Sequence, residues 1–99
     1  MQRGGCVYIM ASEHNGTLYA GVTNNLQRRI WEHRNNVYAD SFTAKYGYHT
    51  LVYYCNFHRI EEAIAEEKRI KGGNRKKKLK LIEDMNPEWR DLWEEVEKW

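Results

Sequence analysis

The feature that most constrains the fold is a hairpin signal near the start of the chain. The runs CVYIMAS (6–12) and TLYAGVT (17–23) are rich in residues typical of strands, and the dipeptide Asn15-Gly16 lies between them. Asn-Gly favours the type I′ turn, whose twist matches that of two antiparallel strands. An antiparallel β-hairpin is therefore predicted.

The other predicted elements follow from hydrophobic periodicity and turn residues. The first is a helix capped by Asn24 or Asn25 that runs to about Asn36, followed by an irregular segment over 38–48 and a strand over 51–57. A second helix begins after His58 and ends at Gly72-Gly73, and a third, capped by Asn74, runs to about Met85. A last helix, begun by Pro87, covers residues 87–99. The residues predicted to face the core from the first two helices are Leu26, Ile30, Val37, Ile60, Ala63, Ile64 and Ile70. The order ββαβααα predicts an α/β (α+β) fold, in which a small three-stranded antiparallel or mixed sheet packs against helices.

Length and composition predict one domain over residues 1–99. The chain has 41% hydrophobic and 30% charged residues, and it holds no apolar run of the ~20 residues that a membrane span needs. The first residues lack the apolar region of a secretory signal. Cys6 and Cys55 have no CxxC or CxxH partner, so we expect reduced thiols and no zinc site. A soluble cytoplasmic protein without a membrane partner is expected.

Charge is distributed unevenly along the chain. Residues 68–80 contain eight basic side chains and no acidic one, whereas residues 84–99 contain six acidic and two basic ones and three of the four Trp. The net charge of +2 hides this asymmetry. A lysine-rich solvated helix would give the same pattern, but a basic segment is also the electrostatic footprint of nucleic-acid binding. The nucleic-acid contacts that we predict are Lys71, Arg75, Lys76, Lys77, Lys78 and Lys80.

Three polar residues are predicted to lie on apolar faces of helices. At ~100° per residue, His33 lies about 20° from Leu26 and Arg29 about 60° from it. By the same arithmetic, Glu67 lies about 20° from Ile60. A carboxylate turned towards a core must be paired, hydrogen-bonded or bound to a metal. A structural Glu67–Arg29 ion pair and a functional role for Glu67 are both consistent with this pattern, and His33 is alternatively a hydrogen-bonded packing residue.

Two strand tyrosines complete a chemically coherent set. Because side chains alternate along a strand, Tyr8 points to the face opposite that of Val7 and Ile9, and Tyr19 points to the face opposite that of its own apolar neighbours. Two phenols, a guanidinium, an imidazole and a carboxylate together provide a proton acceptor, a phosphate clamp and a metal ligand. Such a set suits phosphodiester hydrolysis.

These residues and their spacing resemble the GIY-YIG nuclease superfamily, and in particular its small single-domain members that are similar to the N-terminal nuclease domain of UvrC. Its motif is present in degenerate form as Cys6-Val7-Tyr8 and Tyr19-Ala20-Gly21. The Arg of the family stands ten residues after the second Tyr, which selects Arg29, and a His or Tyr follows four later, at His33. EAIAEEKRIK matches the EAxxxExxIK pattern of the metal-binding Glu, at Glu67.

The resemblance implies an endonuclease that hydrolyses DNA, as in repair or recombination, with one divalent ion such as Mg²⁺ or Mn²⁺. It implies that Glu67 holds the metal, that Arg29 clamps the phosphate and that Tyr19 positions water or phosphate. Tyr8 is the preferred base, but a free phenol has a pKa near 10 and needs nearby positive charge to act near neutrality. His33 orients Tyr8 or takes the role of the base itself.

Two other functions are consistent with the same residues. One is a non-catalytic nucleic-acid-binding module on the same scaffold; it is favoured by Val22, which stands where UvrC-like domains carry Lys, and by the absence of a targeting domain. The other is a protein-interaction adaptor that docks through the Trp-rich tail. The binding module should bind DNA in a salt-dependent manner without metal-dependent cleavage, and the adaptor should do neither. A monomer or weak dimer is expected.

Overall fold

The computed structural model of the chain describes residues 4–13, 16–35 and 50–99. Its elements are β1 (Gly5–Ala11), β2 (Leu18–Thr23), α1 (Leu26–Arg34), β3 (Thr50–Phe57), α3 (Ile60–Gly72), α4 (Arg75–Met85) and α5 (Trp93–Val96). The predicted order ββαβααα and the α+β fold are confirmed. Val37 and the irregular segment predicted over 38–48 lie outside the described residues. None of the described helices is long and apolar enough to cross a bilayer.

The three described strands form one antiparallel sheet in the order β2-β1-β3. The predicted pairing of the first two strands is confirmed, while part of the turn between them lies outside the described residues. In the register, Tyr8 stands opposite Gly21 and Met10 stands opposite Tyr19. Because side chains alternate along a strand, Tyr8 and Tyr19 project from the same face of the sheet.

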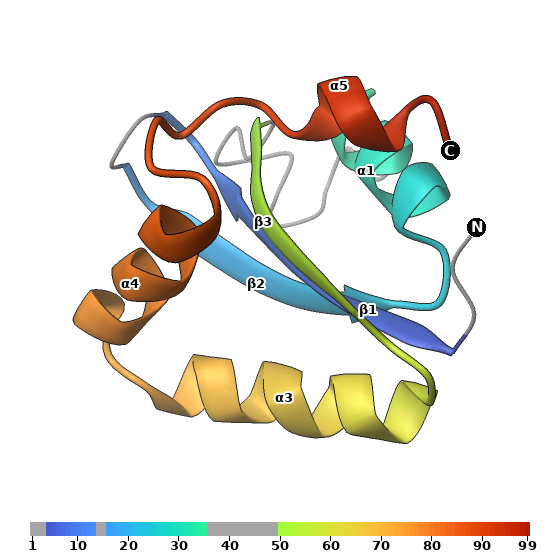
Figure 1. The fold of residues 1–99 in the computed structure, drawn as a ribbon, viewed down its shortest axis with the longest axis horizontal. Helices are drawn as coiled ribbons and strands as arrows, with labels where there is room; N and C mark the ends of the chain where they lie inside the picture. Colours follow the sequence, from blue (N-terminus) through green and yellow to red (C-terminus); the bar gives the residue numbers. More distant parts are fainter. Residues whose placement is uncertain (1–3, 14–15, 36–49) are drawn as a thin grey trace.

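Helices cover both faces of this sheet (Figure 1). The core under α3 and α4 contains Val7, Ile9, Ala20, Val52, Ala63, Ile70 and Ile82. The core under α1 and α5 contains Cys6, Tyr8, Met10, Leu26, Ile30, Leu51, Leu92 and Val96. The central strand β1 is therefore buried along its whole length. The Tyr8 side chain consequently points to the face covered by α1, whereas Glu67 belongs to α3 on the other face.

Asn side chains begin two of the helices, as predicted. The side-chain oxygen of Asn25 accepts a hydrogen bond from the backbone nitrogen of Arg28 at 3.1 Å, and that of Asn74 accepts one from Lys77 at 2.9 Å. Such caps satisfy backbone donors that have no partner within the helix. They set the starts of α1 and α4, and thus the rotation of the functional side chains around each helix axis.

The helix predicted over 87–99 is wrong in extent, because only α5 (Trp93–Val96) is α-helical there. Trp89 has φ of 57°, in the left-handed region. Trp89 is buried in the core with α3 and α4, whereas Leu92 is buried in the core with α1. In a helix, residues three apart lie on the same side. A continuous helix therefore could not place these two side chains on opposite faces of the sheet.

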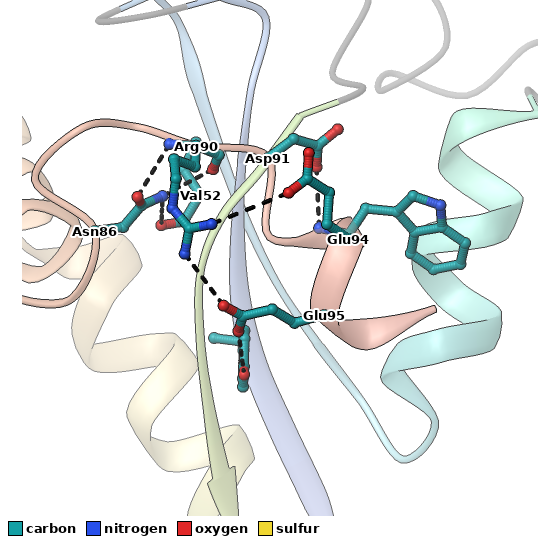
Figure 2. Close-up of polar contacts among 8 residues, drawn as sticks. Val52, Asn86, Arg90, Asp91, Glu94 and Glu95 are labelled. Carbon is teal, nitrogen blue, oxygen red and sulfur yellow. Dashed lines mark hydrogen bonds and ion pairs between the residues drawn. The ribbon is translucent and has the colours of Figure 1, made fainter. Parts of the chain in front are cut away.

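Hydrogen bonds to β3 hold the irregular part of this tail (Figure 2). The buried Asn86 side chain donates to the carbonyl oxygens of Val52 at 3.2 Å and Arg90 at 2.8 Å. Asp91 accepts a hydrogen bond from the backbone nitrogen of Leu51 at 3.3 Å. These side chains replace the helical hydrogen bonds that the sequence pattern predicts.

The prediction for Ile64 is also wrong. Ile64 is 38% exposed, although the stripe arithmetic places it on the core side of α3. Ala63 and Ile70 face the sheet as predicted, with Glu66 and Glu67 half-buried beside them. The two cysteines are free thiols as expected, with Cys6 buried.

Candidate active site

Tyr8, Tyr19 and His33 form a compact cluster on the face of the sheet covered by α1. The Tyr8 hydroxyl lies 3.0 Å from Nε2 of His33, a hydrogen-bond distance. The ring centroids are 6.4 Å apart for Tyr8 and Tyr19, 5.8 Å for Tyr8 and His33, and 5.9 Å for Tyr19 and His33. Strands β1 and β2 and helix α1 thus bring together three of the side chains singled out in the sequence.

Gly21 provides the space for the Tyr8 ring. A Cβ atom at Gly21 would lie 2.5 Å from the Tyr8 hydroxyl oxygen and 2.6 Å from Cζ. Both distances are far below van der Waals contact. The Gly of the second motif is therefore required because the Tyr8 ring lies across the backbone of the neighbouring strand.

We expect Gly21→Ala to lose about 1–3 kcal/mol of stability by overpacking. Any phosphodiester cleavage that depends on this cluster should also fall, on the order of 10²-fold, because the displaced Tyr8 hydroxyl loses its place beside His33. Chemical denaturation and an activity assay measure the two effects. Gly72→Ala is the matched control, since a Cβ atom there meets no atom within 4 Å and should leave activity unchanged. Wild-type activity in Gly21→Ala would contradict this role of the glycine.

Burial determines the protonation state of Tyr8, whose side chain is 1% exposed. Burial raises the pKa of the Tyr8 hydroxyl well above its usual value, and Tyr19 acts in the same direction. The Arg29 guanidinium opposes this shift in pKa, and the Glu67 carboxylate adds to it. Tyr8 is therefore a neutral hydrogen-bond donor near pH 7. This argues against Tyr8 as a base that acts without a proton acceptor beside it.

Arg29 carries a buried donor without an acceptor. Its Nε is buried and donates no hydrogen bond to any described residue, with Glu32 Oε1 at 3.7 Å. An unsatisfied buried N–H costs about 1–3 kcal/mol. The guanidinium is close enough to influence Tyr8 electrostatically. An anion bound beside the Tyr8 cluster would supply the missing acceptor.

Glu67 reaches the cluster from the opposite face of the sheet, through Lys71. The Glu67 Oε2 atom lies 2.8 Å from Lys71 Nζ, and the Glu67 side chain is 13% exposed. Lys71 Nζ in turn lies 5.8 Å from the centroid of the Tyr19 ring, on the edge strand β2. The Glu67–Arg29 ion pair, one of the two sequence-based alternatives, is wrong: Glu67 pairs with Lys71, and Arg29 with Glu32.

The structure gives the six basic residues predicted to bind nucleic acid different surroundings. Lys71 is held by Glu67, and Arg75 donates to the carbonyl oxygen of Gly16 at 2.7 Å. Lys76 is exposed. A separate groove of about 190 Å³ between α3 and α4 is lined by Arg69, Ile70, Gly73, Lys77, Lys78, Lys80, Leu81 and Asp84. Arg69 also lines this groove, although it was not among the predicted contacts despite belonging to the same basic run.

A comparison with known families gives one match that covers most of the chain. The family model described as the GIY-YIG catalytic domain matches residues 4–80. The chain belongs to the GIY-YIG family of nucleases. The matched range contains the tyrosine cluster, Arg29, Glu67 and the basic groove up to Lys80.

The chain is also similar to several relatives named UPF0213 proteins. A UPF0213 protein of Bacillus pumilus is 36% identical over 84 residues, which cover 85% of this chain and 85% of that protein. A UPF0213 protein of Clostridium perfringens is 41% identical over 76 residues, covering 77% of this chain and 80% of the relative. One from Oceanobacillus iheyensis is 40% identical over 77 residues, covering 78% and 87%. No solved structure matches the chain significantly.

The donor set of this GIY-YIG site fits a divalent cation held by one carboxylate. Within the described ranges 4–13, 16–35 and 50–99, no group of three or more His, Cys, Asp or Glu could hold a metal. Mg²⁺ binds oxygen ligands, keeps several waters and commonly takes one or two carboxylates plus substrate phosphates. Glu67 offers one half-buried carboxylate of this kind, close enough to raise the pKa of the Tyr8 hydroxyl. Water and substrate phosphate would complete the coordination.

Proposed function

We propose that this GIY-YIG protein is a metal-dependent endonuclease that hydrolyses phosphodiester bonds in DNA, in repair or recombination. The single observation that carries the proposal is the 3.0 Å contact between the Tyr8 hydroxyl and His33 Nε2. A buried phenol placed on an imidazole can move a proton, and phosphodiester hydrolysis needs one removed from the attacking water.

Tyr8 and His33 act together as the general base in this proposal. In the tautomer that carries its proton on Nδ1, His33 accepts a hydrogen bond from Tyr8 at Nε2. When the Tyr8 oxygen takes a proton from the attacking water, its own proton passes to Nε2. The phenolate, which burial disfavours, then never forms as a stable species.

Arg29 and Glu67 provide the charges for phosphate and metal. The Arg29 Nε donor, which lacks an acceptor among the described residues, would bind a phosphate oxygen and stabilise the charge that develops there. Glu67 would hold a Mg²⁺ or Mn²⁺ ion, which supplies Lewis-acid stabilisation of the phosphoryl oxygens when bound. Tyr19 would position water or phosphate between these groups.

The groove between α3 and α4 supports binding of a long polyanion. Four of its lining residues are cationic, and its one acid, Asp84, is paired with Lys80 at 3.2 Å. Lys77 and Lys78 form no ion pair with the described acidic residues, so they are available to phosphates. Such contacts give salt-dependent affinity that does not depend on base sequence.

We expect the wild-type protein to cut labelled single-stranded, duplex or flapped DNA when Mg²⁺ or Mn²⁺ is present and to stop when EDTA is added. The readout is product formation on a denaturing gel, with binding to the same DNA measured in parallel. Salt-dependent binding without metal-dependent cleavage by folded protein would overturn the nuclease proposal and favour the non-catalytic binding module.

A further inference from the structure

Lys71, a basic residue of α3, contacts both the Glu67 carboxylate and the ring of Tyr19. Its Nζ lies 2.8 Å from Glu67 Oε2 and 5.8 Å from the Tyr19 ring centroid. Lys68, on the same helix, has no contact of either kind among the described residues. Lys71 is therefore the cation that joins the helix on one face of the sheet to the tyrosine cluster on the other.

The local geometry favours this ion pair. A Glu four residues before a Lys is the better orientation of such a pair on a helix. Contact with the aromatic face of Tyr19 adds an attraction for the ammonium. The pair also neutralises the half-buried Glu67 carboxylate, which is 13% exposed and would otherwise be desolvated without a counter-ion.

The same contact conflicts with metal binding at Glu67. The Lys71 ammonium, 2.8 Å from Oε2 of Glu67, occupies a position from which a metal ion would approach that oxygen. Two positive charges so close together also repel each other. Binding of a divalent ion must therefore displace Lys71 or weaken its contact. Because the two cations compete for one carboxylate, whatever strengthens the Lys71–Glu67 pair weakens metal binding.

We propose that Lys71 is a positioning residue that acts as the resident counter-ion of Glu67 and competes with the divalent cation for its carboxylate. This inference rests on the proposed function, in which Glu67 is the metal ligand. Lys71 then holds Glu67 in place before the metal arrives and sets the metal concentration at which the nuclease acts.

Mn²⁺ binding, followed by the electron paramagnetic resonance signal of the free ion, tests this competition without substrate. We expect Lys71→Gln to bind Mn²⁺ about two- to fivefold more tightly than wild type, the range that loss of a half-exposed ion pair gives. Lys68→Gln removes the same charge without touching Glu67, so it isolates the general effect of net charge. Lys71→Met, which keeps the apolar stem over Tyr19, should behave like Lys71→Gln.

The outcomes separate this inference from the proposed function. If Lys71→Gln and Lys68→Gln bind Mn²⁺ equally while Glu67→Gln loses binding, the competition is refuted and Glu67 remains the ligand. If Glu67→Gln binds Mn²⁺ like wild type, Glu67 is not the metal ligand and both proposals fail. Loss of binding in Glu67→Gln with tighter binding only in the two Lys71 variants supports both. Because Lys71 is half-exposed, its variants should fold like the wild type, and circular dichroism checks this.

Discussion

Glu67→Gln is expected to lower metal-dependent cleavage on the order of 10³-fold. The amide keeps the size of the side chain but loses the charge that holds the divalent ion, and that ion contributes several kcal/mol to the stability of the transition state. The measurement is single-turnover cleavage of labelled DNA at saturating protein over a range of Mg²⁺ and Mn²⁺ concentrations. The fold should persist, since Glu67 is half-buried and its partner Lys71 is half-exposed.

Glu66→Gln is the matched control for this experiment. Glu66 is the adjacent residue on α3, its side chain is 19% exposed, and it pairs with Arg69 at 2.6 Å. The control removes the same charge and an ion pair of similar length, one that acts electrostatically on Tyr53 of β3. We expect Glu66→Gln to cleave DNA like wild type. Equal activity of Glu67→Gln and wild type, or equal losses in the two variants, would rule out Glu67 as a specific metal ligand.

The second large effect is expected for Tyr8→Phe and His33→Gln, alone and combined. Each single variant should lose about 10²–10³-fold in the rate of cleavage, the usual contribution of general base catalysis. If the two side chains form one proton relay, the double variant should be only slightly slower than the worse single variant, because either change already breaks the relay. Single-turnover rates for the four proteins complete the double-mutant cycle.

Tyr54→Phe provides a control for the loss of a strand tyrosine hydroxyl. Tyr54 stands opposite Tyr8 in the register of β1 and β3, but its hydroxyl donates to Glu95 at 3.2 Å. Its loss should leave the cleavage rate unchanged. Losses that multiply in the Tyr8→Phe, His33→Gln double variant would mean that the two residues act independently, contrary to the relay.

Most of the local structure was predictable because short-range interactions specify it. Two β-rich runs on either side of Asn15-Gly16 predicted the pairing of β1 with β2. Asn24 or Asn25, and Asn74, were predicted to begin two helices, and the structure shows caps at Asn25 and Asn74. The prediction of the last helix was wrong because hydrogen bonds from Asn86 and Asp91 to β3 determine the conformation of this segment. Such contacts join residues far apart in the sequence, so they leave no periodic signal.

The candidate site was likewise predictable in part: its side chains could be identified from the sequence, but their partners could not. The spacing of Tyr8, Tyr19, Arg29 and His33 and the carboxylate of Glu67 among apolar residues were visible in the sequence, because a strand or helix period places each side chain on a face. Which partner each side chain meets depends on how the faces pack. In the structure, His33 contacts the Tyr8 hydroxyl, and Glu67 pairs with Lys71 rather than with Arg29.

The sequence by itself thus determined the chemical groups, the elements that carry them and the order of those elements. Only the tertiary structure decided that Glu67 approaches from the opposite face of the sheet and meets the tyrosine cluster through Lys71 at the edge strand β2. The physical reason is that periodicity defines directions around one element, whereas distances between side chains of different elements follow from packing around the shared sheet.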